Sequence, residues 1–314
     1  MIAIILKDFG GPDQLEIKEI PEPVIKENEV LIHSRAIGLN PVDVKTRTGK
    51  GQAVKLRNEN PMIIGWDVSG VIVETGTAVS KFKKGDEVFG MINLPGIGKT
   101  YAELVAASQD HITKKPSGIS HEEAAAASLA AMTAWQAIVN QIKIKSGQKM
   151  LIHGASGGVG HFAVQIAKYF GTYVIGTSSA KNKEFVFSIG ADEHIDYKSV
   201  RFEEVSPMVD VILDTIGGEN IDRSLKVLKE GGTIVSLPSG ISESVGEKAA
   251  AQHKKGIFFF VHSNSNDMDQ IAALLQKKVL RAYVSQKFSF EEIRKAHELL
   301  ESGKVKGKLV LTPP

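Results

Sequence analysis

The first third of the chain is a series of short apolar runs separated by turn-forming residues. Residues 30–37 have the apolar, β-branched character of a strand. A second strand is expected over residues 65–75, where Gly70 indicates a bend or a close approach between backbones. Residues 83–86 (Lys-Lys-Gly-Asp) predict a tight turn before the next strand. Strands at this spacing predict a compact, barrel-like domain over residues 1–120.

The hydrophobic pattern changes near residue 120. Residues 120–123 (Ser-His-Glu-Glu) resemble a helix start with acids in the first turn, and an alanine-rich helix is expected from Ala124 to about Gln141. From Gly147 onward, short apolar strands alternate with helical segments, which predicts a doubly wound parallel sheet with right-handed crossovers. The expected strands cover residues 149–153, 173–176, 209–214 and 232–237, and the expected helices cover residues 159–170, 181–189 and 221–228.

The last residues return to the character of the first domain. A helix is expected over residues 290–301 and a strand over residues 307–311. We therefore expect an α/β protein in which a domain formed by residues 121–265 is inserted into a β domain formed by residues 1–120 and 266–314. A chain of 314 residues suits two domains of ordinary size.

Charge and cysteine content exclude several classes of function. The 38 basic and 36 acidic residues leave a net charge of +2, which gives no strong attraction to nucleic acid or to an anionic membrane. The chain has no cysteine, which excludes disulfides, thiolate zinc sites and a cysteine nucleophile. No targeting segment is visible and no apolar run approaches the ~20 residues that span a bilayer, so the expected location is the cytoplasm.

A glycine-rich motif lies where the first expected strand of the second domain turns into a helix. Residues 154–160 read Gly-Ala-Ser-Gly-Gly-Val-Gly, an A-x-G-x-x-G pattern from Ala155. The glycines let the backbone approach a diphosphate and the helix pack on the sheet, and the helix start attracts phosphate oxygens. An ordinary glycine-rich turn is the alternative, but the strand–helix–strand context favours a dinucleotide site. The residues expected to contact the cofactor here are Gly154, Ser156, Gly157, Gly158 and Val159.

The end of the next strand predicts which dinucleotide is bound. An NAD site usually carries an acid there, ~20 residues beyond the motif, which binds the ribose hydroxyls. This chain has no acid at that place and instead carries Ser178, Ser179 and Lys181, whose hydroxyls and ammonium attract a 2′-phosphate. We therefore expect NADPH. In the alternative, Ser179 caps the following helix and Lys181 is solvated, although capping and phosphate binding can coexist.

Three motifs stand together in the order and spacing of a known superfamily. They are residues 38–43 (Gly-Leu-Asn-Pro-Val-Asp), residues 64–72 (Ile-Gly-Trp-Asp-Val-Ser-Gly-Val-Ile) and the glycine motif at 154–160. Over essentially its whole length the chain resembles the medium-chain dehydrogenases/reductases, and among them the zinc-free quinone oxidoreductase and enone (alkenal) reductase group. The resemblance implies a GroES-like β-barrel catalytic domain with an inserted Rossmann domain, and an active site in the cleft between them.

The resemblance also implies a reaction without a metal. Zinc alcohol dehydrogenases of the superfamily carry a Cys where this chain has Asn40, a His where it has Trp66, and a third ligand near Leu129. Without a Lewis acid the alkoxide of an ordinary alcohol is poorly stabilised. A conjugated carbonyl or a quinone needs only modest hydrogen bonding to its oxygen as hydride arrives. A zinc dehydrogenase is therefore the disfavoured alternative.

Three residues of the first domain are expected near the reaction. Asn40 matches an Asn that lies near the nicotinamide ribose and the substrate in the resembling enzymes, with a role in shaping the turn before Pro41 as the alternative. Lys45 stands where quinone reductases often carry Tyr, and it either polarises a carbonyl oxygen or is solvated. Tyr101 matches a segment beside the cleft, where the Tyr is more often structural. Asp43 could order the same loop as Asn40.

Further cofactor contacts are implied by the same resemblance. Thr133 matches a helix position that faces the nicotinamide, with a hydroxyl bonded to its own helix as the alternative. Tyr197 matches a position near the adenosine phosphate. In relatives the strand around residues 257–261 pairs across a homodimer, so a homodimer is expected, and a core strand is the alternative. The remaining contacts are expected just beyond strand ends, at Thr215, Ile216, Leu237, Pro238 and Val261.

Two functions of different class are consistent with these features. The first is an NADPH-dependent oxidoreductase that transfers hydride to a small-molecule quinone or to the C=C bond of an α,β-unsaturated carbonyl. The second is an NADPH-binding protein with a non-enzymatic role, such as a sensor or a crystallin-like protein. Oxidation of NADPH in the presence of an alkenal, an enone or naphthoquinone separates the two.

Overall fold

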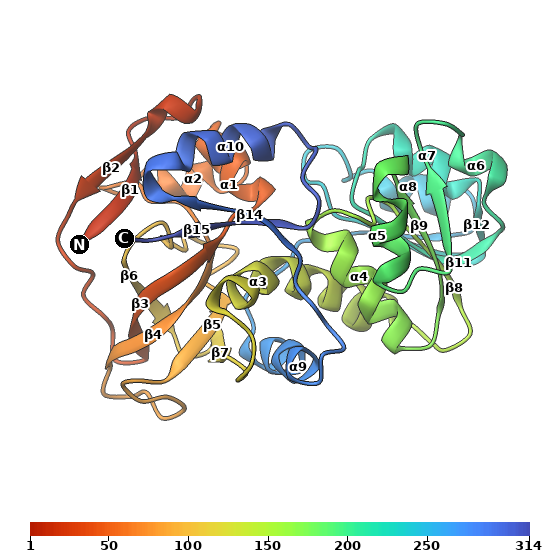
Figure 1. Cartoon of the computed structure of the whole chain (residues 1–314). Coiled ribbons are helices and arrows are strands. Elements are labelled where there is room, and N and C mark those ends of the chain that lie inside the picture. The colour runs from red at the N-terminus through yellow and green to blue at the C-terminus, as the bar shows by residue number, and fades with distance from the viewer. The chain divides into compact units, whose positions relative to one another are not determined.

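The chain divides into two compact units. The structure is a computed structural model that describes residues 1–314. The first unit contains Met1–Met132 and His262–Pro314, and the second contains Thr133–Val261 (Figure 1). Both ends of the chain therefore belong to the first unit, and the second unit is an insertion in its sequence.

Helix α3 (His121–Trp135) crosses the first boundary between the units. The sequence pattern places the junction at the start of this helix, near residue 120. In the structure Ala125 and Ala126 of the helix pack with Ala36 and Val310 of the first unit. Most of α3 therefore belongs to the first unit, although the sequence pattern assigned the whole helix to the second domain.

The first unit is built on mostly antiparallel strands, as the apolar runs of residues 1–120 predict. A seven-stranded sheet has the order β14-β15-β3-β4-β5-β7, with β6 also paired to β3, and β1 and β2 form a separate pair. The backbones approach closely at Gly70, where a side chain would collide with the His33 carbonyl. The strands are β1 (Ile2–Leu6), β2 (Leu15–Glu19), β3 (Glu29–Gly38), β4 (Asp67–Thr75), β5 (Glu87–Met91), β6 (Leu104–Ser108), β7 (Ile112–Lys114), β14 (Val284–Ser289) and β15 (Lys308–Thr312).

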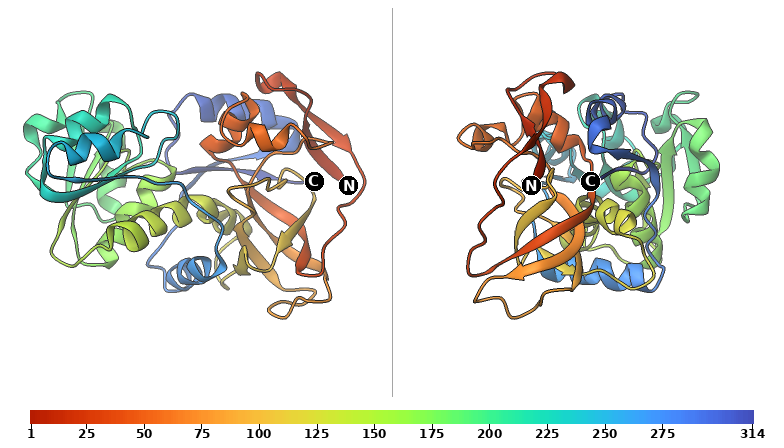
Figure 2. Two further views of the ribbon diagram at one scale, coloured as in Figure 1. Left: turned by 180° about the vertical axis from the view of Figure 1, so that it is seen from behind. Right: turned by 60° about the vertical axis from the view of Figure 1, so that its left-hand side comes forward.

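Short helices cover parts of this sheet. Helix α10, from the end of the chain, lies beside α1, from its beginning, and both views of the ribbon show the two together (Figures 1 and 2). The buried Arg47 of α1 binds Glu301 at the end of α10, which ties the two helices. The helices of this unit are η1 (Pro12–Gln14), α1 (Pro41–Arg47), α2 (Ala53–Leu56), α3, α9 (Ser265–Gln276), η4 (Phe290–Glu292) and α10 (Ile293–Glu301).

The second unit contains a six-stranded parallel sheet, which confirms the predicted doubly wound architecture. Its strand order is β10-β9-β8-β11-β12-β13. In chain order this is 3-2-1-4-5-6, the arrangement of a Rossmann domain. The strands are β8 (Lys149–Ile152), β9 (Tyr173–Ser178), β10 (Glu193–Asp196), β11 (Val209–Asp214), β12 (Leu228–Ser236) and β13 (Lys255–Phe258).

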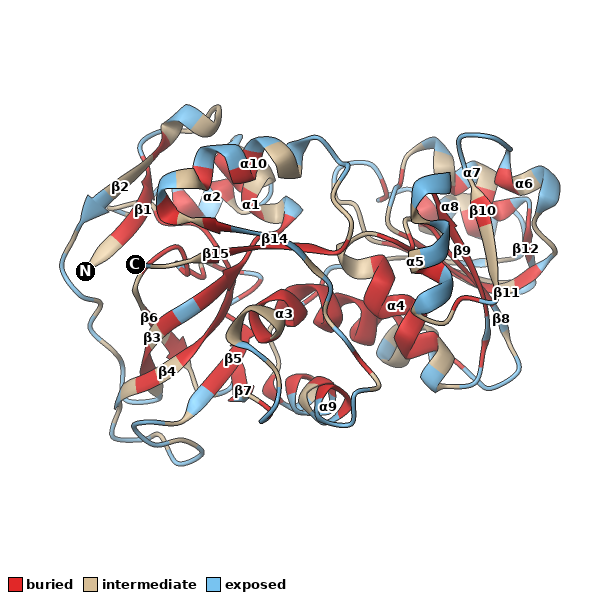
Figure 3. Cartoon of the chain, viewed as in Figure 1, coloured by how far each residue is buried: buried red, intermediate tan, exposed pale blue.

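Helices connect these strands, and α4 is the most deeply buried of them. Eight of its twelve residues are buried, and its ribbon is mostly red in Figure 3. The alanine-rich helix predicted to reach about Gln141 changes at Gln136 to the π-helical segment η2 (Gln136–Ile142). The other helices are α4 (Gly158–Tyr169), η3 (Ala180–Asn182), α5 (Lys183–Ser188), α6 (Phe202–Val205), α7 (Glu219–Leu225) and α8 (Val245–Ala250). None of the helices in the structure has both the length and the apolar character that crossing a membrane requires.

Candidate active site

The parallel sheet has one edge at which the carboxyl ends of its strands meet. Strands β8 and β11 are neighbours there, while β9 lies on the far side of β8 and β12 on the far side of β11. Open α/β sheets bind ligands at such a switch point. The segment after β8 and the segment after β11 are in contact, because Thr215 Oγ1 donates to His153 O at 2.8 Å.

The glycine loop (residues 154–157) is held against the end of β9. Ala155 N donates to Thr177 O at 2.9 Å, and Gly154 N donates to Thr177 Oγ1 at 3.3 Å. Helix α4 also lies against this loop. A Cβ at Gly160 would come within 2.8 Å of Ala155 Cα, so only glycine permits this approach. Gly160 was expected to let the helix pack on the sheet, and in the structure its close contact is with the loop that follows β8.

Helix α4 opens toward the loop with unused amide groups. It begins at Gly158, with Gly157 as its N-cap. Its first i→i−4 hydrogen bond runs from His161 N to Gly157 O at 3.1 Å. The amides of Gly158 and Val159 precede that bond and have no acceptor within the helix. Two backbone donors and the positive end of the helix dipole can therefore hold a phosphate oxygen here.

The residues expected to recognise a 2′-phosphate have different environments at the end of β9. Ser178 is buried, and its Oγ lies 2.8 Å from His194 Nε2 of β10. Ser179 is partly exposed and accepts a hydrogen bond from Asn182 Nδ2 at 3.4 Å. Lys181 is exposed. Although Ser179 directly precedes η3, its side chain makes no capping bond, so its hydroxyl is not used in the way the capping alternative requires.

The turn after β11 is held by the buried Asp214, the last residue of that strand. Its carboxylate accepts hydrogen bonds from Ile216 N at 3.0 Å, Gly217 N at 3.1 Å and Ser236 Oγ at 2.7 Å. Leu237 N donates to Asp214 O at 3.0 Å. Asp214 therefore fixes the backbone at the ends of β11 and β12, where the nicotinamide contacts were expected.

The other expected cofactor contacts lie in two places. Tyr197 directly follows β10 and is 54% exposed, and Pro238 follows Leu237 beyond β12. These positions share the carboxyl edge of the sheet with the glycine loop. Thr133 and Val261 are the first and last residues of the second unit, and both are buried. Val261 lies three residues beyond the end of β13, so the strand expected to reach it is shorter than the pattern predicts.

A buried polar cluster surrounds Asn40 in the first unit. Asn40 N donates to Asp43 Oδ2 at 2.7 Å across the first turn of α1, and Asn40 Nδ2 donates to Asp67 Oδ2 at 2.8 Å. Asn40 Oδ1 accepts from Lys308 Nζ, which also donates to Leu39 O at 2.8 Å. The Asn40 carboxamide is therefore held between a carboxylate and an ammonium, and these two partners determine its orientation.

Burial opposes both charges of this cluster. It raises the pKa of Asp67 to about 6, against the effect of the Lys308 ammonium and the hydrogen bond from Asn40. Burial also lowers the pKa of Lys308, which the carboxylates of Asp67 and Asp43 oppose. Lys308 Nζ and Asp67 Oδ2 lie 3.5 Å apart. Each ion offsets the cost of burying the other, so removal of one would leave an uncompensated charge.

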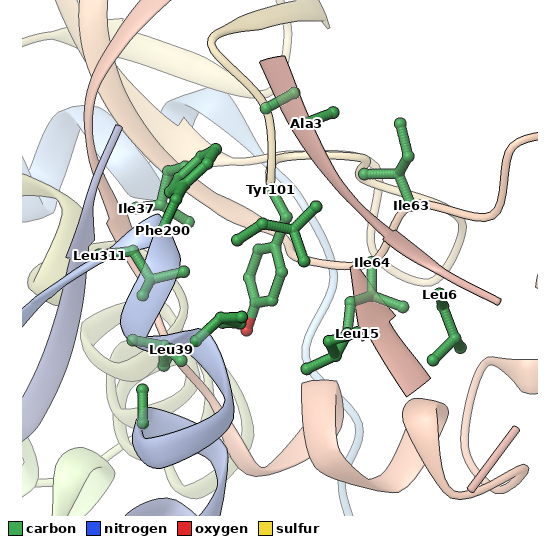
Figure 4. Packing of buried hydrophobic residues seen from close by; sticks show 14 of the residues in the cluster. Ala3, Leu6, Leu15, Ile37, Leu39, Ile63, Ile64, Tyr101, Phe290 and Leu311 are labelled. Atoms are coloured by element: carbon green, nitrogen blue, oxygen red, sulfur yellow. The ribbon is translucent and has the colours of Figure 1, made fainter. Parts of the chain in front are cut away.

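Tyr101 lies in the core of the first unit. Its ring is surrounded by apolar side chains in Figure 4. Its hydroxyl donates to Asp43 Oδ2 at 2.9 Å and lies 3.1 Å from His297 Nε2 of α10. Burial raises the pKa of Asp43 to about 7, and burial followed by the nearby Arg47 guanidinium lowers the pKa of His297 to about 3. Both Asn40 and Tyr101 therefore bind Asp43, and the structural alternative weighed for Tyr101 agrees with its burial.

Lys45 lies on α1 two residues beyond Asp43 and is partly exposed. Residues two apart on a helix point to different faces. Of the three residues expected near the reaction, the structure thus brings Asn40 and Tyr101 together through Asp43 and places Lys45 on another face of the helix.

Sequence reasoning missed several residues of these sites, among them Lys308, His297 and Asn182. Lys308 could have been noticed in the sequence, because it begins the apolar strand segment 308–311. A lysine in such a place needs either a buried partner or a solvent-exposed ammonium. His297 and Asn182 carried no local signal. The partner of His297 comes from a distant segment, and Asn182 binds Ser156 of the glycine loop as well as the nearby Ser179.

The described chain contains no group of three or more His, Cys, Asp or Glu side chains that could hold a metal ion. At the position where zinc enzymes of the resembling superfamily carry a Cys ligand, the Asn40 side chain is bound to the ammonium of Lys308.

A Rossmann sheet inserted into a β unit, with a glycine loop at its switch point, defines a two-domain, dinucleotide-dependent dehydrogenase or reductase. Residues 26–117 match the family model of the alcohol dehydrogenase GroES-like domain. Residues 189–311 match the model named zinc-binding dehydrogenase. The chain belongs to the medium-chain dehydrogenase/reductase superfamily, to which these two domains belong, and the fold expected from the sequence is confirmed.

Three similar proteins indicate which group of the superfamily this chain resembles. The 2-methylene-furan-3-one reductase of Solanum lycopersicum is 35% identical over 98% of this chain and 77% of its own length. The chloroplastic NADPH-dependent alkenal/one oxidoreductase of Arabidopsis thaliana is 34% identical over 100% of this chain and 80% of its own. The structure of the quinone oxidoreductase from Coxiella burnetii is 39% identical, with a TM-score of 0.95 over 99% of both chains.

Proposed function

We propose that the chain is an NADPH-dependent oxidoreductase that transfers hydride to a quinone or to the C=C bond of an α,β-unsaturated carbonyl. The observation that carries the proposal is similarity over nearly the whole chain to enzymes named for these reactions. The carboxyl edge of the parallel sheet supports it, because its glycine loop and acid-free strand end suit a phosphorylated dinucleotide.

The residues at this edge fit NADPH. The amides of Gly158 and Val159 would bind the diphosphate, and Ser179 with Lys181 would bind the 2′-phosphate. The missing acid at the end of β9 itself matters because a carboxylate in that place binds the ribose hydroxyls and would repel the phosphate. The Asp196 carboxylate of the neighbouring β10 is bound to the Ala180 amide. Thr215, Ile216 and Leu237 would line the nicotinamide half, on backbone that Asp214 holds in place. When bound, NADPH supplies the hydride, and the protein positions it and excludes water.

We propose that residues of the first unit bind and orient the substrate that accepts the hydride. Lys45 would donate to the carbonyl oxygen, on which negative charge develops as hydride adds. Asn40 would bind the nicotinamide ribose with a carboxamide that Lys308 and Asp67 orient. We assign Tyr101 a positioning role, because its hydroxyl is bound to Asp43 in the interior.

We also propose that the reaction does not use zinc. The buried ammonium of Lys308 beside Asn40 and Asp67 places a positive charge where a metal cation would have to bind. Metal analysis of the purified protein, together with activity before and after treatment with a chelator, tests this. Stoichiometric zinc whose removal abolishes turnover would contradict it.

The proposed activity is tested by following NADPH oxidation at 340 nm with a panel of acceptors. We expect turnover with at least one of an alkenal, a cyclic enone and 1,4-naphthoquinone, and lower kcat/KM with NADH. Lys45→Met should lower kcat with a carbonyl acceptor while leaving the Kd of NADPH unchanged. Tight NADPH binding without turnover of any acceptor would instead support the non-enzymatic role.

We further propose a homodimer that forms through β13 and a cytoplasmic location. β13 is an edge strand of the parallel sheet, and Phe260 just beyond it is 38% exposed. An unpaired strand edge beside apolar side chains favours pairing with a second copy. Light scattering coupled to size-exclusion chromatography should give twice the mass of one chain, and Phe260→Lys should shift the equilibrium to monomer. Cell fractionation tests the location.

A further inference from the structure

Asn182 occupies a capping position but does not cap. It directly precedes α5, and asparagine at such a position normally accepts a hydrogen bond from an amide of the first helical turn. Its side chain makes no such bond here. Instead, Asn182 Nδ2 donates to Ser156 Oγ at 3.0 Å and to Ser179 Oγ at 3.4 Å.

These two bonds join the two phosphate-binding parts of the proposed cofactor site. Ser156 belongs to the glycine loop after β8, and Ser179 follows β9. The other hydrogen bonds that connect the loop to the end of β9 run to the carbonyl and the hydroxyl of Thr177. The Asn182 carboxamide therefore fixes the separation of two side chains that follow different strands.

The direction of the two bonds also determines what the serines can bind. A serine hydroxyl has one proton and two lone pairs. Because each Oγ accepts from Asn182, each hydroxyl proton points elsewhere, and neither hydroxyl donates to another group of the protein. The pair therefore presents two donors, and a phosphate is a pure acceptor that two donors and the exposed Lys181 would suit.

We propose that Asn182 is a positioning residue that determines the preference for NADPH over NADH, by holding Ser156 and Ser179 as hydrogen-bond donors to the 2′-phosphate. This inference rests on the proposed NADPH-dependent function. It adds the residue that organises the phosphate site without having to touch the cofactor.

Two substitutions of Asn182 test the proposal by different routes. Asn182→Ala removes both bonds and frees the serines to rotate. Asn182→Asp keeps the shape, but its carboxylate accepts from both hydroxyls, turns their protons inward and adds a negative charge. Ser188→Asp, on the exposed face of the same helix, is the matched control for the added charge.

The readout is the Kd of NADPH and of NADH, from titration of cofactor fluorescence, together with competition by 2′,5′-ADP and 5′-AMP. We expect Asn182→Ala to raise the Kd of NADPH and of 2′,5′-ADP roughly tenfold, with changes for NADH and 5′-AMP within about twofold. Asn182→Asp should have a larger effect of the same kind. In Asn182→Ala the KM for NADPH should rise while kcat at saturating NADPH stays unchanged.

The results separate this inference from the function on which it rests. If the wild-type protein does not bind NADPH in preference to NADH, the proposed cofactor is wrong. If the wild type prefers NADPH and Asn182→Ala keeps the full preference, the role of Asn182 is refuted while the function stands. Equal weakening of NADPH and NADH would show a merely structural role, as would an effect of Ser188→Asp as large as that of Asn182→Asp.

Discussion

Several ionisable side chains are buried in the interior of the first unit, where a charge without a partner would be strongly destabilising. Asp43, Asp67 and Lys308 are all buried, and two carboxyl groups share one ammonium. Burial, with a smaller contribution from the charge of Asp67, raises the pKa of Asp43 from 3.8 to about 7, although the hydrogen bond from the Asn40 amide opposes this increase. Asp43 is the group of this cluster with the higher carboxyl pKa, above that of Asp67, which is raised to about 6.

The raised pKa of Asp43 predicts a dependence of stability on pH. The folded state binds more protons than the unfolded state between pH 4 and 7, so this carboxyl lowers the stability as the pH rises through that window. Asn at position 43 cannot ionise but can still accept from Tyr101. The free energy of unfolding of wild type relative to Asp43→Asn should therefore fall by about 2 kcal/mol from pH 5 to pH 8.

Urea unfolding at the two pH values measures this difference. Asp13→Asn, at an exposed position, is the control and should show the same pH dependence as the wild type. A constant difference between wild type and Asp43→Asn across this window would mean that Asp43 is not protonated in the folded protein.

The buried ion pair predicts a second result at this scale. Lys308→Met should lower the free energy of unfolding by about 3–5 kcal/mol, because the buried Asp67 loses the ammonium that compensates its charge. The double variant Lys308→Met/Asp67→Asn removes both charges and should recover most of that loss. Urea unfolding midpoints test the pair. If the double variant is as unstable as the single one, Lys308 contributes packing rather than charge compensation.

At the scale of elements, two glycines near the start of α4 have different tasks. Gly160 is needed for the fold, because a side chain there would collide with the glycine loop behind it. A Cβ added at Gly157 would have one close neighbour, the Gly154 carbonyl oxygen at 3.2 Å. The φ of Gly157 is −83°, which any residue can adopt. Its small size therefore matters for a ligand that approaches the backbone.

These tasks predict opposite behaviour of two alanine variants. Gly160→Ala should lower the thermal stability of the cofactor-free protein by about 1–3 kcal/mol, since the helix must move away from the loop. Gly157→Ala should keep that stability but weaken NADPH binding. Calorimetry of the free protein and titration with NADPH measure the two effects, and an equal loss of stability in both variants would contradict the distinction.

At the scale of the whole molecule, the first unit depends on both ends of the chain. Strand β15 pairs with β14 on one side and with β3 on the other, so a C-terminal strand completes a sheet that the N-terminal residues begin. The same strand begins with Lys308, the partner of Asn40. The fold of this unit and the orientation of Asn40 thus depend on the residues that follow the inserted second unit.

Ligand binding to the second unit predicts a change in the stability of the protein. A ligand that binds only the folded state at 100 times its Kd stabilises that state by about 2.7 kcal/mol. NADPH should therefore raise the melting temperature, and NADH at the same concentration should raise it less. Lys181→Ala should reduce the difference between the two cofactors. Equal shifts with NADH and NADPH in the wild type would contradict the assignment of the 2′-phosphate site.

The sequence alone determined the features that depend on local pattern. Short apolar runs alternating with helical segments predict the parallel sheet, because each strand or helix reflects the periodicity of its own residues. The glycine motif and the absence of an acid after β9 were readable for the same reason, since each lies within one turn of the chain. These features were sufficient to predict the fold class and the cofactor.

Only the tertiary structure decided which polar side chains meet in the interior. Lys308 binds Asn40 across 268 positions of sequence, and Tyr101 lies beside His297 across 196 positions. The Asn182 side chain binds Ser156 of the glycine loop instead of capping its own helix, which depends in the same way on a distant segment. No local pattern encodes such contacts, because a buried polar group is stable only with a partner, and the fold brings that partner from a distant segment.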